Sequence, residues 1–553
     1  MQSAWCVYPA DPERARTLAE TARVHPTTAQ LLLNRDIRDS TQAARFLHPT
    51  FGALQDPRML PDMEKAVFRL RQAVSQHESI MVFSDSDVDG LTSGAIVYEL
   101  LADLGASVQA RQSNRILEGY GLPQVLVDEL RRSAVSLLVL VDCGTNQADA
   151  IQQLHAAGIE TVIIDHHVPL EAWAKPCALV NPHRTQGPGL ELCSAGLAFK
   201  LAHAMLDGCA DEARLRQYAD LAALGTLADC VPLTGENRII VSEGLPQIFR
   251  THRRGLRRLC EVVELSEPEP EHVLKRLVPK LNAAGRLGDC TAVWPLLLGG
   301  ELRQLDEWLA RVEASHATTK RLHGQIQAQA QEQVNRLHFG DEFVMVLSRA
   351  GWHQGLMGPL AAQLARRYGR PAIAIAMDGM RGVGSGRSVP MFNLLNALKS
   401  CRELLVRFGG HAQACGLTID QKHLERFRIV INEQAKRSLG RQGLLKTRVI
   451  DLELPLCDVT ELWVGETSRL APFGQGNVRP TIVIRGVTIQ VKSPRVASVC
   501  DEGRSLPAKG QFSGVSSGGR YDVIATPVWT GSEVALMLND VKGSEEPSLH
   551  VHS

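Results

Sequence analysis

The chain has 553 residues, and its 60 basic and 60 acidic side chains balance to a formal net charge of zero. This length predicts several domains, and the neutral balance means that any binding to nucleic acid depends on local patches. The cysteines show neither zinc-finger spacing nor a disulfide framework, no apolar run reaches the ~20 residues of a membrane helix, and the start lacks a signal-peptide pattern. We therefore expect a cytoplasmic protein that does not associate with membranes.

The first part of the chain predicts an α/β domain after a helical segment. Residues 1–75 have a polar, helical composition. From residue 79, short apolar runs alternate with helical segments at 79–83, 91–104, 107–111, 137–141, 148–157 and 161–164. This alternation is typical of a doubly wound parallel sheet, so we predict an α/β domain over residues 76–300.

The second part predicts three further units. Residues 301–337 contain no proline and only one glycine, and as a helix they would span about 50 Å, enough to connect two lobes. A second α/β domain is expected over 338–445, with glycine-rich turns at 379–386. Short β runs separated by turn residues then predict a small barrel over 446–545.

Acidic and imidazole side chains follow two apolar runs of the first α/β domain. Asp85, Asp87 and Asp89 alternate after one run, and Asp165-His166-His167 follows another. Because the carboxyl ends of parallel strands lie along one edge of a sheet, both clusters should face one crevice. Closely spaced carboxylates repel one another unless a cation lies among them, and carboxylate with imidazole ligands suits Mn²⁺ or Mg²⁺. The pattern predicts a divalent-metal hydrolase acting on phosphate, although a single strand-end Asp is more commonly a helix N-cap.

Candidate phosphate contacts lie in turn-like sequence. Arg115 and Arg286 each stand beside Asn or Gly, where a guanidinium can fork onto a phosphate. Ser385 and Arg387 are two apart among glycines and can grip a terminal phosphate. Taken singly, an Arg of this kind is more often a solvated surface charge, and Gly409-Gly410-His411 is equally typical of a plain turn.

Nine motifs in a fixed order carry a family resemblance. They resemble those of the DHH phosphoesterases, and the full set is similar to that of RecJ-type exonucleases over about residues 30 to 545. The motifs begin at Asp85, Asn114, Val141, Asp165, Ala223, Asn282, Gly351, Gly384 and Phe408. The resemblance implies 5′→3′ hydrolysis of single-stranded DNA by two Mn²⁺ or Mg²⁺ ions, a DHH domain, a DHHA1-type domain that closes over the substrate and an OB-type nucleic-acid-binding barrel.

The same resemblance implies the site residues. The ligands or immediate neighbours of the two ions are Asp85, Asp87, Asp89, Asp142, His166, His167 and Asp229, with Asp165 added to the catalytic set. We expect His166 to be a ligand, and His167 to support the ligands or contact phosphate. The 5′-phosphate is assigned to Arg115, Ser385 and Arg387, and stacking on a base to Tyr120. The other implied substrate contacts are Asn282, Arg286, Gly409, Gly410 and His411. Lys280 stands where the family usually has Arg, and a lysine cannot form the bidentate contact that a guanidinium makes.

Two alternatives remain beside this hypothesis. One is a nanoRNA or cyclic-dinucleotide phosphodiesterase of the DHH superfamily, but these generally lack the barrel. The other is an inactive DNA-binding scaffold, but such relatives have lost metal ligands, whereas all seven positions are present here. A role in DNA repair and recombination would add a single-strand-binding protein and a helicase as partners. Within the barrel, the segment 495–519 is as typical of a basic loop that contacts DNA as of solvated charge.

Overall fold

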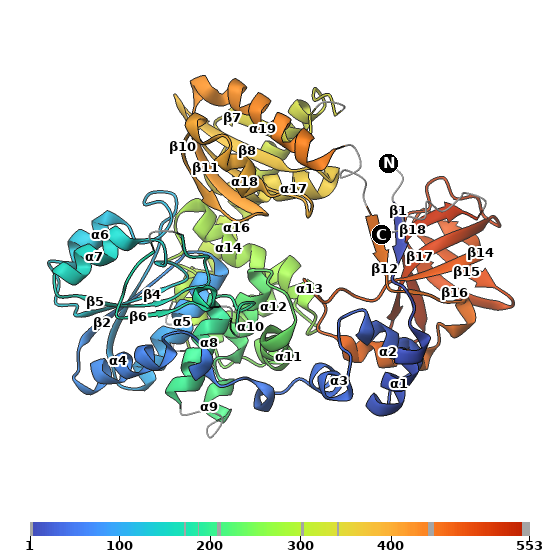
Figure 1. Ribbon diagram of the computed structural model, residues 1–553, viewed down its shortest axis with the longest axis horizontal. Coiled ribbons are helices and arrows are strands. Elements are labelled where there is room, and N and C mark those ends of the chain that lie inside the picture. The colour runs from blue at the N-terminus through green and yellow to red at the C-terminus, as the bar shows by residue number, and fades with distance from the viewer. Residues whose placement is uncertain are drawn as a thin grey trace.

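The computed structural model describes residues 4–170, 173–185, 187, 189–206, 212–299, 304–339, 342–440 and 447–544. Figure 1 shows three lobes: a large lobe around the first sheet, a second α/β lobe joined to it through α16, and a barrel lobe beside the N-terminal helices. The predicted fold class is therefore confirmed. The start of the predicted connecting helix, residues 301–303, lies outside the described residues, as do residues 446 and 545.

A five-stranded parallel sheet in the order β3-β2-β4-β5-β6 organises the large lobe. Its strands are β2 (Ser79–Ser84), β3 (Ser107–Gln112), β4 (Leu137–Val141), β5 (Glu160–Ile164) and β6 (Ala178–Val180). The chain places β3 on one side of β2 and then β4 on the other, so the direction of winding reverses between β2 and β4. Ligands of doubly wound folds bind at the carboxyl edge at such a point.

Alternating strand side chains bury both faces of this sheet. In β4, Val139 joins the core beneath α4, α5 and α8, whereas Leu138 and Leu140 join the core beneath α6 and α7. A strand buried on both faces has to be apolar throughout, which explains the uninterrupted apolar sequence of β4. The covering helices are α4 (Met63–Ser75), α5 (Val88–Asp103), α6 (Gln124–Leu130), α7 (Ala148–Ala156) and α8 (Ser194–Met205).

Further helices complete the large lobe and lead to the second. They are α9 (Glu212–Arg216), α10 (Ala219–Ala228), α11 (Gly235–Phe249), α12 (Arg254–Val262), α13 (Pro270–His272), α14 (Val278–Leu287), α15 (Trp294–Leu297) and α16 (Leu305–Val334). The long helix α16 packs on α14, where Lys280 forms an ion pair with Glu313.

The second lobe has a mixed sheet in the order β10-β11-β9-β8-β7, in which only β7 and β8 are parallel. Its strands are β7 (Met345–Ala350), β8 (Ala372–Asp378), β9 (Arg381–Arg387), β10 (Leu405–Gly410) and β11 (Ala414–Asp420). Its helices are α17 (Met357–Tyr368), α18 (Leu394–Lys399) and α19 (Leu424–Leu439). Cores lie on both faces, one with α17 and the other with α18 and α19.

The predicted glycine-rich turns at 379–386 are wrong for most of that range, because Arg381–Arg387 forms strand β9. Its three buried glycines alternate with outward residues. A Cβ at Gly382 or Gly384 would overlap Ile375, and one at Gly386 would overlap Leu394. The glycines therefore allow close packing inside a sheet. In the sequence alone, such a glycine-rich stretch cannot be told from a turn.

The C-terminal strands form a closed barrel in the order β14-β15-β16-β18-β17, with β17 pairing back to β14. The strands are β14 (Ile482–Ser493), β15 (Val496–Asp501), β16 (Arg504–Lys509), β17 (Arg520–Trp529) and β18 (Val534–Gly543). This closure is consistent with the predicted OB-type barrel. The basic loop suggested at 495–519 is instead largely the hairpin of β15 and β16, and Arg504 donates to the carbonyls of Cys457 and Val459.

The N-terminal segment divides between two cores. Helices α1 (Pro12–Ala22), α2 (Pro26–Leu33) and α3 (Ser40–Leu47) share a hydrophobic core with the barrel and with α20 (Glu461–Thr467), whereas α4 belongs to the core of the first sheet. Ala4–Val7, within the segment predicted to be helical, forms strand β1 and pairs in parallel with β12 (Thr447–Ile450); a short β13 (Leu452–Glu453) then pairs with β14. Strand β1 thus belongs to the barrel lobe, where Trp5 and Val7 pack on Val483 and Ile524.

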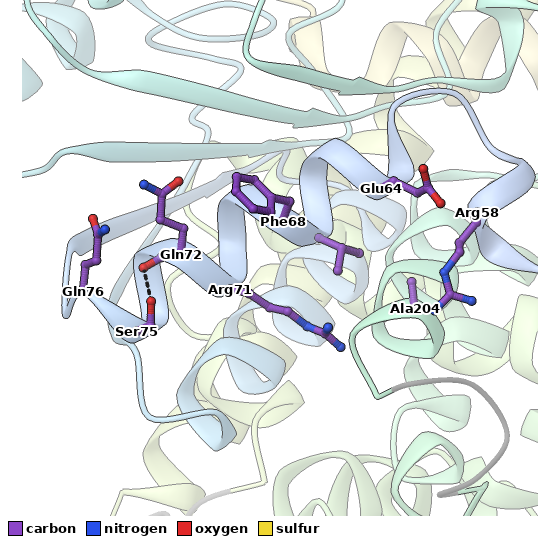
Figure 2. Close-up of a pocket in the computed structure, with 9 residues that line it drawn as sticks. Arg58, Glu64, Phe68, Arg71, Gln72, Ser75, Gln76 and Ala204 are labelled. Carbon is purple, nitrogen blue, oxygen red and sulfur yellow. Dashed lines mark hydrogen bonds between the residues drawn. The ribbon is translucent and has the colours of Figure 1, made fainter.

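Among the helices that the structure describes, none has both the length and the apolar sequence needed to cross a membrane. A surface pocket lies along α4, where Phe68 is exposed beside Arg58, Arg71 and Ala204 (Figure 2). None of its lining residues belongs to the predicted site.

Candidate active site

Strand ends and helix ends bring the predicted ligands to one edge of the first sheet. Asp85 directly follows β2, Asp142 follows β4, and the Asp165-His166-His167 run follows β5. Asp87 caps α5 by accepting the Gly90 amide at 3.1 Å, Asp89 lies in the first turn of the same helix, and Asp229 ends α10. The two clusters seen in the sequence therefore lie together at one edge of the sheet.

Asp142 and His166 occupy the centre of this cluster. Asp142 belongs to two groups with mutually close ligand atoms, one with Asp85 and Asp87 and the other with His166 and His167; Asp89, Cys193 and Asp229 form a third. His166 Nε2 lies 3.5 Å from Asp142 Oδ1 and 3.8 Å from Asp89 Oδ2, and its Nδ1 lies 3.8 Å from Asp229 Oδ2. Asp142 has a φ of +62°, a left-handed conformation that Asp and Asn tolerate better than most residues.

The electrostatics of this cluster suit a cation. Burial, together with the charges of Asp89 and Asp87, raises the pKa of Asp142 to about 8. Burial and the charge of Asp229 raise the pKa of Asp89 to about 7, and burial raises that of Asp229 to about 6. Divalent cations among these carboxylates would relieve the repulsion. The oxygen and imidazole donors fit Mn²⁺ or Mg²⁺.

His167 is held by groups outside the ligand cluster. Its Nδ1 lies 2.7 Å from Asp165 Oδ1, and its backbone carbonyl accepts from the Asn181 side-chain Nδ2 at 2.8 Å. Although burial opposes it, the Asp165 charge raises the pKa of His167 to about 9. The Tyr120 hydroxyl lies 3.1 Å from the His167 ring nitrogens. Asp165 is therefore placed to orient His167, and Tyr120 presents its hydroxyl to that histidine while its ring stays partly exposed.

Arg115 bridges the first two aspartates. Its Nε donates to Asp85 Oδ1 at 2.7 Å and its Nη2 donates to Asp87 Oδ2 at 2.8 Å. The Ser113 hydroxyl also donates to Asp85 Oδ1, at 2.6 Å. Although burial favours protonation, Arg115 keeps the pKa of Asp85 below its ordinary value. Arg115 therefore contacts the ligand cluster directly, and a phosphate would compete with Asp87 for its guanidinium.

Several supporting residues were not predicted from the sequence. Besides Ser113 and Asn181, these are Thr145, whose amide donates to Asp165 Oδ2 at 3.1 Å, and Ser194. Ser113 and Asn181 directly follow β3 and β6. The strand-end rule that drew attention to the aspartates would thus have identified both of them. Thr145 and Ser194 carry no such local signal.

The second lobe faces this edge with His411 and Arg387, and Arg286 lies on α14 of the large lobe. The His411 ring stacks on His167 at a centroid distance of 6.1 Å. Arg387 donates to the Ser385 hydroxyl at 3.0 Å. Burial lowers the pKa of Arg286 and of Arg387, and among the described residues no carboxylate forms an ion pair with either guanidinium. Two half-buried cations without a carboxylate partner form a site suited to phosphate.

The remaining predicted substrate residues, Asn282, Gly409 and Gly410, support the backbone around the site. Asn282 Oδ1 accepts the Val88 amide at 3.2 Å, so Asn282 supports the aspartate loop. Gly410 has a φ of +129°, and a Cβ there would overlap the Ala414 carbonyl, whereas Gly409 borders open space. The lack of a side chain at Gly410 therefore lets the backbone pass close to Ala414 just before His411.

Gly355 controls how closely the lobes approach. A Cβ at this position would overlap the Arg286 carbonyl, so Gly355→Ala is expected to push α14 away and to lower stability by roughly 1–3 kcal/mol, the usual cost of overpacking. The unfolding temperature and the affinity for substrate should both fall. Gly324→Ala in α16 is the control, since a Cβ there meets nothing within 4 Å and alanine favours a helix. Equal stability of the two variants would contradict the close contact.

Comparisons with known proteins agree with this arrangement. The DHH family, N-terminal domain, matches residues 79–226, and the DHHA1 domain matches residues 341–437. The single-stranded-DNA-specific exonuclease RecJ of Dickeya dadantii is 32% identical over 497 residues, which cover 85% of each chain. The Bacillus subtilis RecJ is 32% identical over 492 residues, which cover 88% of this chain but 62% of that relative, so the chain spans less than two thirds of its length. The crystal structure of RecJ in complex with Mn²⁺ from Thermus thermophilus has a TM-score of 0.85 at 26% identity and covers 98% of this chain and 80% of that one; the Mg²⁺ complex has a TM-score of 0.78.

Proposed function

Because the chain belongs to the RecJ family of single-stranded-DNA-specific exonucleases, we propose that it hydrolyses single-stranded DNA from the 5′ end with two Mn²⁺ or Mg²⁺ ions. The observation that carries this proposal is that a carboxylate and imidazole cluster lies close to guanidiniums that form no ion pair with any described carboxylate. Carboxylates and His166 gather on the large lobe. Arg286 lies on α14 of the same lobe, where the charge of Asp87 acts on it, and Arg387 lies on β9 of the second lobe. A phosphodiester bound here would meet the ion ligands and the phosphate-binding guanidiniums together.

The residues of this chain have separable roles in that reaction. We assign ion binding to the seven predicted ligand positions, with Asp142 placed to serve both ions. When bound, two such ions lower the pKa of a water molecule and neutralise charge on the phosphate. Arg115, Ser385 and Arg387 hold the terminal phosphate, which fixes the distance from the 5′ end to the bond that is cut. His411, stacked on His167, closes the crevice.

The alternatives receive less support. A nanoRNA or cyclic-dinucleotide phosphodiesterase would not need the closed barrel, and an inactive scaffold would not need to retain the clustered carboxylates. We assign the barrel to binding of the extended strand. A single-strand-binding protein and a helicase as partners remain predictions that follow from a role in DNA repair and recombination. A cytoplasmic location remains a prediction from the sequence.

Labelled substrates test the proposal. Purified protein with Mn²⁺ is incubated with single strands labelled at the 5′ or the 3′ end, with duplex DNA and with short RNA. We expect 5′-labelled single strands to release labelled mononucleotide at once and 3′-labelled strands to shorten progressively, while excess EDTA stops both reactions. Faster cleavage of short RNA would favour the first alternative, and full activity in EDTA would contradict the metal-dependent mechanism.

Arg387 is expected to determine the preference for a 5′-phosphate. Arg387→Ala should remove most of the rate advantage of 5′-phosphorylated over 5′-hydroxyl strands, because a hydrogen bond to a charged group contributes roughly 1.5–3 kcal/mol, about 10- to 150-fold. Arg381→Ala is the matched control, since Arg381 lies at the other end of β9 and pairs with Asp420 at 3.4 Å. An unchanged phosphate preference in Arg387→Ala would refute this assignment.

A further inference from the structure

Helix α8 begins at the carboxylate cluster, and its first turn contacts two of the proposed ligands. The amides of Ser194 and Ala195 donate to the Asp89 carboxylate, one to each oxygen, at 2.9 and 2.8 Å. The Ser194 hydroxyl donates to Asp142 Oδ1 at 2.9 Å. Both Ser194 and Ala195 are fully buried, so these bonds are shielded from competing water.

The orientation of Asp142 matters more than that of any other carboxylate in the cluster. It is the residue shared by the groups Asp85–Asp87–Asp142 and Asp142–His166–His167, so it is placed to give oxygens to two ions. The carboxylate of an Asp side chain rotates over a broad range of its terminal torsion. A carboxylate shared by two ions therefore has to be fixed in one orientation. A donor on one lone pair of Oδ1 limits the rotation.

We propose that Ser194 is a positioning residue for the two-ion site, in which its hydroxyl fixes the Asp142 carboxylate while the first amides of α8 fix Asp89. This inference rests on the proposed two-ion function. The α8 N-terminus adds partial positive charge between the two aspartates. Loss of an outer hydrogen-bond partner of a metal ligand typically weakens metal binding or activity by about 10- to 100-fold.

The Ser194 hydroxyl does not serve its own helix. An N-cap serine accepts a hydrogen bond from an amide of the turn it begins. In α8 the N-cap position belongs to Cys193, which makes no side-chain capping bond. The Ser194 hydroxyl donates instead to a residue 52 positions away, and Asp89 satisfies the first two amides. Removing the hydroxyl should therefore leave the start of α8 intact.

Mn²⁺ binding by the full chain tests the proposal without depending on nuclease activity. Ser194→Ala is compared with Ser93→Ala, because Ser93 is equally buried but donates to the backbone carbonyls of Asp89 and Gly90 in its own helix, at 2.6 and 3.1 Å, and to no ligand carboxylate. Free Mn²⁺ is measured by electron paramagnetic resonance during titration, and unfolding temperatures are measured in EDTA. We expect Ser194→Ala to bind Mn²⁺ about 10- to 100-fold more weakly and Ser93→Ala to bind like the wild type. Ser194→Thr, which keeps the hydroxyl, should recover affinity relative to Ser194→Ala.

The possible outcomes separate the two proposals. Wild-type affinity in Ser194→Ala would overturn the positioning role while leaving the two-ion function standing. Equal losses in Ser194→Ala and Ser93→Ala, or a loss in Ser194→Ala that tracks a lower unfolding temperature in EDTA, would also overturn it by reducing Ser194 to a packing residue. A wild-type chain that binds no Mn²⁺ would overturn both proposals.

Discussion

Asp142→Asn is expected to abolish hydrolysis with little effect on the fold. Asparagine has the same size as aspartate and also tolerates the left-handed φ of +62° at this position. It lacks the negative charge that both ions need. Because Lewis-acid stabilisation contributes several kcal/mol, the rate should fall by roughly 10³-fold or more. Initial rates at several Mn²⁺ concentrations measure this, and circular dichroism checks the fold.

Two further variants sharpen this prediction. His166→Ala should behave like Asp142→Asn, because its ring lies among Asp89, Asp142 and Asp229. Asp149→Asn is the control, since this carboxylate lies exposed in the first turn of α7, the helix that follows β4. Added Mn²⁺ should restore EDTA-treated wild type and the control only. Full activity of Asp142→Asn would contradict the central place of Asp142.

Removing the barrel alone is expected to unfold the N-terminal helices. Leu18, Leu31, Leu32 and Leu47 are buried in the core that α1–α3 share with the barrel. Each buried leucine contributes roughly 1.5–3 kcal/mol, so together they approach the ~5–15 kcal/mol that stabilises a typical domain. A chain of residues 1–440 should therefore aggregate or lose its first 48 residues to protease, as limited proteolysis and circular dichroism would show.

Removing both parts of that lobe should give a different result. Residues 49–440 keep every proposed ligand and phosphate-binding residue, so cleavage of very short oligonucleotides should survive. Long strands should bind more weakly, with a shallower slope of log affinity against log salt, because phosphate contacts to the barrel are lost. Identical salt slopes for the full chain and for 49–440 would reduce the barrel to a structural role. A protease-resistant N-terminus in 1–440 would contradict the shared core.

The sequence by itself determined the first sheet and the edge on which its site is built. Apolar runs such as Leu137–Val141 predict buried strands because a strand covered on both faces has to be apolar throughout. In a parallel sheet the residues after each strand then meet at one edge. That local rule places Asp85, Asp142 and His166 together without knowledge of any distant contact, and it would also have identified Ser113 and Asn181.

The tertiary structure decided what depends on contacts distant in the sequence. The glycines of β9 have the composition of a turn, and only packing against Ile375 and Leu394 makes them a strand. The sequence of α1–α3 shows that each helix has an apolar face. It does not show that the residues covering those faces lie more than 400 positions later in the chain. Likewise, Ser194 resembles any residue at a helix start until folding brings Asp142 within 2.9 Å of its hydroxyl. Periodicity and strand ends are local properties that the sequence carries directly, whereas the partner of a buried face or hydroxyl is fixed only when remote segments pack together.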